Sequence, residues 1–167
     1  MCRSSINCSV PKKWTYAQCR ERWLGNDPCF TFRNVNDYIK VTYYGLEGSE
    51  FKKPEDFIKN LKGLFGQFET SERVKFDGRK TMLIKLRYEQ GKHYDHHGGY
   101  RLPEFLYEEF LILSLKEGFF VFNFNLNHLT PIPFDFTKES ESKNLYGDAY
   151  DEYQTWMSFI DSCKINQ

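Results

Sequence analysis

The stretch between Lys80 and Leu129 is the part of the sequence that most constrains the fold. It contains three runs rich in β-branched and aromatic residues, which are Thr81–Tyr88, Phe105–Leu115 and Phe119–Leu126. Such runs are typical of strands that pack one face against a covering layer. The turn after the first run carries the sequence Lys92-His93-Tyr94-Asp95-His96-His97-Gly98-Gly99, which we expect to project into solvent. A dense antiparallel sheet with a histidine-rich turn is therefore predicted.

Further strands and two helices are expected around this stretch. Two strands are predicted at Cys29–Arg33 and Tyr38–Tyr44, and Asp77-Gly78 predicts a tight hairpin. Pro54 suits the first position of a helix, after which apolar residues recur at helical spacing, namely Phe57, Ile58, Leu61, Leu64, Phe65 and Phe68. A second helix is predicted at about Asp148 to Ser162 and a terminal strand around Ile165, whereas residues 138–144 have the composition of a loop.

The order of these elements predicts an α+β fold, in which a single antiparallel β-sheet meander is flanked by two amphipathic helices. At 167 residues the chain is long enough for one hydrophobic core and short for two. We expect residues 1–27 to be a cysteine-containing segment that packs on a single domain formed by residues 28–167.

Charge and hydropathy exclude several classes of protein. Lys+Arg and Asp+Glu balance at 23 each, so no net charge attracts nucleic acid, and we expect no nucleic-acid binding. The apolar runs are too short for a transmembrane segment, and the first residues do not resemble a signal peptide. An aromatic content of 18% predicts a folded chain, which we expect to be a monomer.

The five cysteines indicate a cellular compartment. Four of them, Cys8, Cys19, Cys29 and Cys163, are candidates for two disulfides in an oxidising compartment. One bridge is expected to tie the N-terminal segment to the C-terminal end, although four cysteines allow three connectivities. Buried reduced thiols are the alternative interpretation.

Cys2 directly follows the first methionine and precedes a polar stretch. This arrangement predicts a bacterial lipoprotein that is anchored by acyl chains on Cys2, and the alternative is an ordinary N-terminal segment that contains a cysteine. The expected localisation is periplasmic, outer-membrane-anchored or secreted.

The histidine-rich turn offers the ligand types that Zn²⁺ or Cu²⁺ prefers. His93, Asp95, His96 and His97 supply three imidazoles and a carboxylate within five residues. Their spacing matches no helical zinc motif, so a solvated polar turn is the competing interpretation. No other cofactor is expected. Two nearby tyrosines, Tyr94 and Tyr100, are candidates for contacts with a partner protein.

No catalytic signature stands out in the sequence. The carboxylate pairs Glu108-Glu109, Asp151-Glu152 and Glu139 with Glu141 are expected to lie in solvent, and no serine lies in a nucleophile-elbow motif. We therefore predict that the protein is not an enzyme. A small hydrolase with an unrecognised site remains the alternative.

Four short motifs resemble the superfamily of the photosystem extrinsic protein PsbP and the DcrB-type bacterial lipoproteins. They are Pro54-Glu55-Asp56-Phe57, Asp77-Gly78-Arg79, Gly118-Phe119-Phe120-Val121 and Trp156-Met157-Ser158-Phe159-Ile160. The resemblance extends over residues 28 to 165 and implies a PsbP-like fold with a binding, docking or chaperone role. Together with the cysteines, it predicts a non-enzymatic cell-envelope or secreted module that acts through protein–protein contacts.

Overall fold

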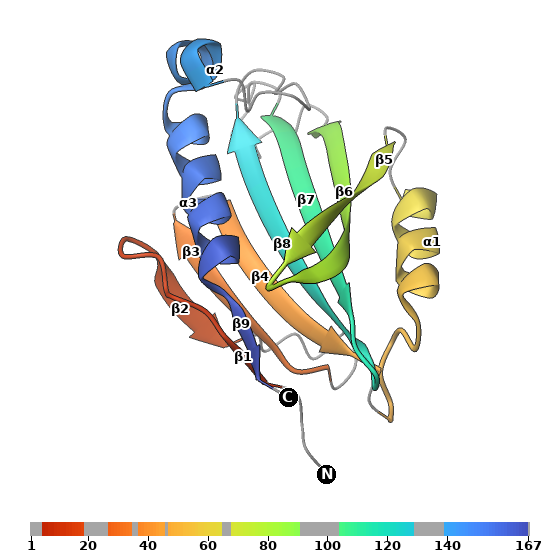
Figure 1. The fold of residues 1–167 in the computed structure, drawn as a ribbon. Helices are drawn as coiled ribbons and strands as arrows, with labels where there is room; N and C mark the ends of the chain where they lie inside the picture. Colours follow the sequence, from red (N-terminus) through yellow and green to blue (C-terminus); the bar gives the residue numbers. More distant parts are fainter. Residues whose placement is uncertain are drawn as a thin grey trace, which may run out of the picture.

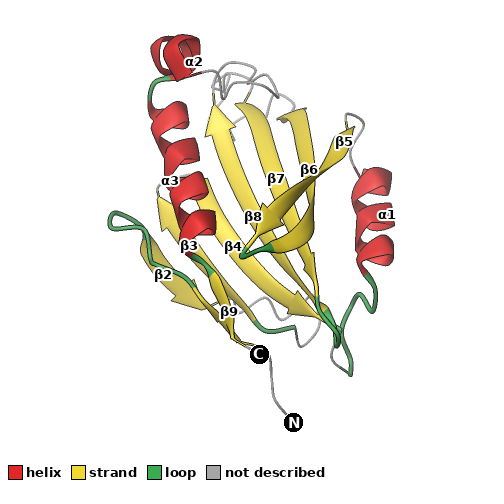
Figure 2. Ribbon diagram, in the orientation of Figure 1, coloured by secondary structure: helices red, strands yellow, loops and turns green. Residues whose placement is uncertain are grey.

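The structure is a computed structural model that describes residues 5–18, 27–34, 37–45, 47–64, 68–90, 104–128 and 139–166. In chain order its elements are β1 (Ser5–Asn7), β2 (Thr15–Gln18), β3 (Cys29–Asn34), β4 (Asp37–Tyr44), α1 (Pro54–Leu64), β5 (Phe68–Phe76), β6 (Arg79–Gln90), β7 (Glu104–Ser114), β8 (Phe119–His128), α2 (Glu139–Tyr146), α3 (Asp148–Ser162) and β9 (Lys164–Asn166). Helices and strands are mixed along the chain, as Figure 2 shows by colour, so the expected α+β class is confirmed.

The strands form two antiparallel sheets, and the expectation of a single meander is wrong. Seven strands pair in the order β2-β3-β4-β8-β7-β6-β5, while β1 and β9 pair separately as a small second sheet (Figure 1). Strands β5 to β8 do follow one another as a meander. However, β4 pairs with β8 instead of β5, because the chain passes through α1 after β4 and starts β5 at the far edge.

Helix α3 covers one face of the large sheet (Figure 1). Its Trp156 ring stacks on Phe124 of β8 with centroids 5.5 Å apart, and Phe159 contacts Phe32 of β3 at 5.6 Å. Trp156 and Phe159 are both almost fully buried. The predicted boundaries of this helix and the terminal strand after it are confirmed. The helix is amphipathic, so burial of its aromatic side holds it on the sheet.

Helix α1 packs on the opposite face of the same sheet. Its Phe57 and Leu61 join a buried cluster with Ile84 of β6 and Phe110 of β7, and the rings of Phe57 and Phe110 lie 5.8 Å apart. The helix ends at Leu64, so the predicted helical stripe was too long, and Phe68 instead opens β5.

Two glycine turns fix the ends of the sheet. Asp77 and Gly78 both have positive φ and make the predicted hairpin between β5 and β6. Gly118 lies between β7 and β8 with φ +87°, and a side chain there would overlap the carbonyl oxygen of Tyr44. Strands β4 and β8 approach so closely at this point that only glycine fits.

Three elements were not predicted. Residues 139–146 form α2 where a loop was expected, and this helix packs against α3. Strands β1 and β2 lie in the N-terminal segment, and β2 extends the large sheet by pairing with β3. The described residues therefore contain a third helix in addition to the expected pair.

Candidate functional site

An open hollow of about 900 Å³ lies where α2 meets α3, and we call it the junction groove. Among the described residues its lining comes from the ends of β3, β4 and β8, the α2–α3 junction and the loop before β2. These residues are Lys13, Asn34, Asp37, Leu126, Asn127, His128, Asn144, Leu145, Tyr146, Gly147, Asp148, Ala149 and Glu152. Three carboxyl groups thus share a hollow with one lysine and one histidine.

Local structure places the groove's polar residues. Asn34 and Asp37 face each other across the β3–β4 hairpin, and the Asp37 carboxylate accepts a hydrogen bond from the Asn127 backbone N–H at 2.9 Å. His128 ends β8, where its ring meets Tyr146 of α2 edge-on at 6.1 Å. The hairpin, the end of β8 and α2 therefore converge on one point.

Glu152 is the most unusual group in the junction groove. Its Oε1 accepts a hydrogen bond from the side-chain amide of Asn34. Its Oε2 is buried and has no hydrogen-bond partner among the residues that the structure describes. Burial is the main cause that raises the pKa of Glu152, and repulsion from Asp37 and Asp148 adds to it. A buried acceptor without a donor is costly, so Glu152 carries an unsatisfied oxygen in the lining of this groove.

Burial also raises the pKa of Asp37, while its hydrogen bond from Asn127 and the charge of His128 act in the opposite direction. The charge of Asp37 is one of the causes that raise the pKa of Glu152. Repulsion between like charges is reciprocal, so an ionised Glu152 disfavours ionisation of Asp37 in turn. The junction groove therefore holds a coupled pair of carboxyl groups.

A second hollow of about 480 Å³ continues along α3, and we call it the arm groove. It lies between the segment that joins β1 to β2 and the exposed flank of α3. Its described lining consists of Ser9, Val10, Pro11, Lys12, Lys13, Trp14, Asp151, Glu152, Gln154, Thr155, Ser158 and Phe159. Val10 is 54% exposed there. Because Lys13 and Glu152 line both grooves, the two hollows are adjacent.

The Glu108-Glu109 pair was expected in solvent, and that expectation is wrong. Glu109 is 1% exposed and Glu108 5% exposed. Successive residues of a strand point to opposite faces, so the two carboxyl groups lie on different sides of the sheet. Glu109 accepts hydrogen bonds from Tyr107 and from the Trp156 indole at 2.8 Å, and Lys85 lies 3.9 Å away.

Glu108 has its own partners on the α1 side of the sheet. It accepts hydrogen bonds from Asn125 at 2.8 Å and from Tyr38 at 3.3 Å. Burial is the main cause that raises the pKa of both Glu108 and Glu109. Each carboxyl group is hydrogen-bonded inside the core, and this arrangement indicates that they stabilise the fold instead of facing a ligand.

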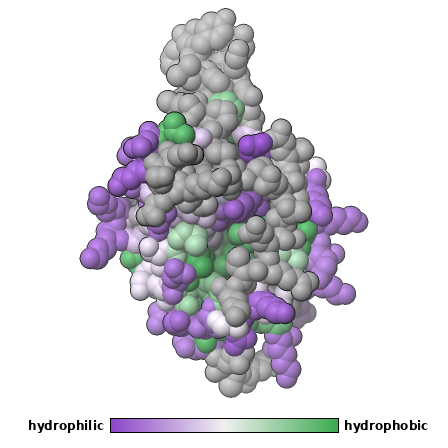
Figure 3. Space-filling view, turned by 45° about the horizontal axis from the view of Figure 1, so that its top comes forward, coloured by the Kyte–Doolittle hydropathy of each residue, from purple (hydrophilic) through white to green (hydrophobic). Residues whose placement is uncertain are grey.

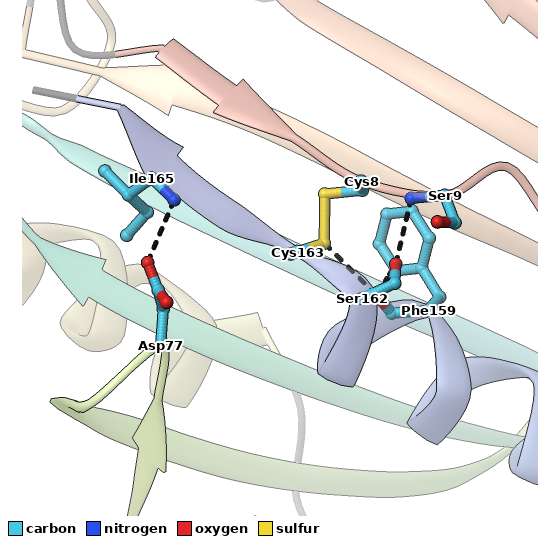
Figure 4. The surroundings of a disulfide bond; sticks show 7 residues. All are labelled: Cys8, Ser9, Asp77, Phe159, Ser162, Cys163 and Ile165. Carbon is cyan, nitrogen blue, oxygen red and sulfur yellow. Dashed lines mark hydrogen bonds between the residues drawn. A yellow bond between two sulfur atoms is a disulfide. The ribbon is translucent and has the colours of Figure 1, made fainter.

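One of the cysteine pairings left open by the sequence is present. Cys8 and Cys163 form a disulfide that joins the segment after β1 to the residue before β9 (Figure 4). The Ser9 backbone N–H donates to Ser162 Oγ at 2.9 Å beside it. Cys29 is disulfide-bonded as well. The bridge holds the two ends of the described chain together.

Several predicted site residues lie outside the described residues. They are the metal-ligand candidates His93, Asp95, His96 and His97, the contact candidates Tyr94 and Tyr100, the lipid-anchor candidate Cys2, and Cys19. Within the described parts of the chain, no group of three or more His, Cys, Asp and Glu side chains is placed to hold a metal ion. The metal and lipid assignments therefore stay predictions.

The sequence did not single out the residues that form the junction groove. Asp37 lies just before the predicted strand Tyr38–Tyr44 and was not a candidate site residue, and Glu152 was only half of an acidic pair that was expected in solvent. A raised pKa from burial and an unpartnered oxygen are tertiary properties, so no local pattern signals them. Of the neighbouring charges, Asp148 marked only the predicted start of a helix, and Asp151 was the other half of that acidic pair.

Outside the two grooves, we consider the hydropathy of the described surface. On the face shown in Figure 3, hydrophilic residues surround a smaller hydrophobic area. Among the described residues, Val10, Tyr16, Leu145 and Met157 are the exposed large hydrophobic side chains, and Val10 and Leu145 line the grooves. None of the described helices is long and apolar enough to cross a membrane.

Comparison with known proteins gives a weak structural similarity. No protein-family model matches the chain, and no match is found among curated proteins. The chain is similar to the crystal structure of LpqN, which is involved in cell envelope biogenesis of Mycobacterium tuberculosis. The two share 14% identity at a TM-score of 0.46, over 99% of this chain and 85% of that one. This similarity is too low to establish a shared fold or function.

Proposed function

We propose that this protein is a non-enzymatic binding domain that works in the cell envelope or outside the cell and recognises another protein. The Cys8–Cys163 disulfide supports the compartment, because stable disulfides form and persist in oxidising environments. The disulfide bond of Cys29 points the same way. The PsbP-like and lipoprotein assignments from the sequence agree with this role and stay predictions.

The junction and arm grooves together form the recognition surface in this proposal. They run side by side along α3, with Lys13 and Glu152 between them. Such a surface suits an extended segment of a partner protein. A basic side chain of the partner segment would meet the unpartnered oxygen of Glu152, and an apolar residue of the same segment would lie against Val10 and Phe159. Charge pairing sets the orientation, and apolar contact adds affinity.

The single observation that carries this proposal is the buried, unpartnered Oε2 of Glu152 at the meeting of the two hollows. The hydrolase alternative is less well supported. The described lining of the junction groove contains carboxylates and His128 but neither serine nor cysteine, so no side-chain nucleophile of that kind accompanies them. The metal-binding alternative depends on residues 93–97, which lie outside the described residues.

Selection from a random peptide library displayed on phage tests the recognition surface directly. We expect enriched peptides to pair Lys or Arg with an apolar residue and to lose binding to a Glu152→Lys variant. Glu55→Lys is the matched control, since Glu55 is exposed on α1, away from both grooves. Peptides that bind the Glu152→Lys variant as well as the wild type would refute the assignment of the site.

A free-thiol count tests the compartment separately. Protein exported to an oxidising compartment is expected to show fewer reactive thiols than its five cysteines before reduction, and all five afterwards. Five reactive thiols in the native exported protein would contradict the proposed location.

A further inference from the structure

We propose that the junction groove is regulated by protons. The pair formed by Asp37 and Glu152 takes up one proton from water as the pH falls, and this proton competes with a basic side chain for the same carboxyl groups. The identity of the competing cation rests on the proposed function. The proton uptake itself is a property of the free protein.

The geometry supports a shared proton. Asn34 donates to one oxygen of Glu152, and the other oxygen is buried without a hydrogen-bond partner. Asp37, which lines the same groove, accepts a hydrogen bond from the Asn127 backbone N–H. Two ionised carboxylates in a partly desolvated hollow repel each other, and either a proton or an external cation relieves that repulsion.

The other charged groups around the pair come from α3, β8 and the segment before β2. Helix α3 contributes Asp148 and Asp151, β8 contributes His128, and the segment before β2 contributes Lys13, while α2 lines the groove with Asn144 and Tyr146. Asp148 and Asp151 disfavour ionisation of Glu152, whereas His128 favours ionisation of Asp37. The acidic groups on α3 therefore strengthen the tendency of the pair to keep a proton.

The directions of the pKa shifts agree with this arrangement. Burial is the main cause that raises the pKa of both Asp37 and Glu152. A carboxyl group with a raised pKa stabilises the fold fully at low pH, and that contribution is lost as the pH rises through its folded pKa. Ionisation of both groups thus leaves a pair of repelling charges in the groove, and a bound cation would relieve that repulsion.

The proton uptake is tested on the free protein by ¹H–¹⁵N NMR between pH 8 and pH 4.5. The Asn127 backbone amide reports on Asp37, and the Asn34 side-chain amide reports on Glu152. We expect both signals to follow one common transition. In Glu152→Gln the Asn127 transition should move to lower pH, because the repulsion from Glu152 is gone.

Two control variants test whether the transition comes from the Asp37–Glu152 pair or from the neighbouring charged residues. Asp151→Asn removes an exposed charge one residue away and should shift the Asn127 transition less than Glu152→Gln does. His128→Gln should leave a transition in place, which shows that the carboxyl pair titrates. An Asn127 transition that is unchanged in Glu152→Gln, or abolished in His128→Gln, would overturn the inference.

The competition is tested with N-acetyl-arginine amide as the probe. Its affinity for the wild type should fall by about fivefold or more from pH 7.5 to pH 5, because proton uptake and cation binding exclude each other. Glu152→Gln should bind weakly at both values. Equal wild-type affinity at the two pH values would overturn the inferred regulation by protons but would leave the proposed recognition site in place. Absence of binding at either pH, with the NMR transition present, would overturn the competition and the assigned recognition site but leave the proton uptake intact.

Discussion

Removal of the Cys8–Cys163 disulfide should cost a large part of the stability of this protein. The two cysteines are 155 residues apart in sequence, so the bridge closes a loop that contains nearly the whole chain. For a loop of that length the chain-entropy relation gives about 5 kcal/mol at 25 °C. Domains of this kind are stable by about 5–15 kcal/mol in total, so the bridge is a major share.

The test is a Cys8→Ala/Cys163→Ala double variant, which leaves no free thiol at this position. Urea unfolding is followed by tryptophan fluorescence and far-UV circular dichroism, and we expect the free energy of unfolding to fall by about 3–5 kcal/mol. The dependence on urea should also steepen, because the unfolded chain expands without its cross-link.

Ser162→Ala is the matched control for this prediction. It removes the hydrogen bond from the Ser9 backbone beside the same disulfide but keeps the covalent bond. Its expected cost is about 1 kcal/mol. A loss of only about 1 kcal/mol in the double variant would refute the loop-closure reasoning, since the relation requires several times that amount.

Three further predictions concern the core and the sheet ends. Gly118→Ala should lower the free energy of unfolding in urea by about 3 kcal/mol or more, because φ is +87° and the new side chain meets backbone atoms. Gly48→Ala is the control, since φ is +83° but the space is open, and it should lower that free energy by about 1 kcal/mol. Burial raises the pKa of Glu109, so the contribution of this carboxyl group to stability is lost as the pH rises through its folded pKa. The melting temperature of the wild type should therefore fall more from pH 5 to pH 8 than that of Glu109→Gln. The Asp77 pKa is lowered chiefly by its hydrogen bond from the Ile165 backbone, so this contact should weaken as pH falls through the folded pKa. We expect the Ile165 amide to exchange its hydrogen faster in Asp77→Asn than in the wild type at pH 7, and equal exchange would show that the charge of Asp77 does not strengthen this hydrogen bond.

The Asp77 contact also shows how the two sheets are joined. The hairpin between β5 and β6 ends the large sheet, and Asp77 accepts a hydrogen bond from Ile165 of β9 at 3.0 Å (Figure 4). Lys164 lies 3.4 Å from the same carboxylate. Because β9 is tied to β1 by pairing and by the adjacent disulfide, the turn connects the far edge of the large sheet to both chain ends.

The buried glutamates show what composition alone cannot reveal. Glu108 and Glu109 lie in a run that alternates poorly between polar and apolar residues, and an acidic pair in such a run was assigned to solvent. In the structure each residue finds donors on a different face, from Asn125 and Tyr38 in one case and from Trp156 in the other. Those donors come from distant parts of the chain, so their presence could not be inferred from residues 108 and 109.

The sequence by itself determined the elements whose signals are local. Apolar spacing placed α3, Asp77-Gly78 placed a hairpin turn, and aromatic, β-branched runs placed the central strands, because helix and strand periods are properties of neighbouring residues. Only the tertiary structure decided that β4 pairs with β8, that α2 forms against α3, and that Asp37 meets Glu152 in one groove. Pairing, burial and electrostatic coupling depend on which distant segments come together, and that choice is made by the packing of the whole chain.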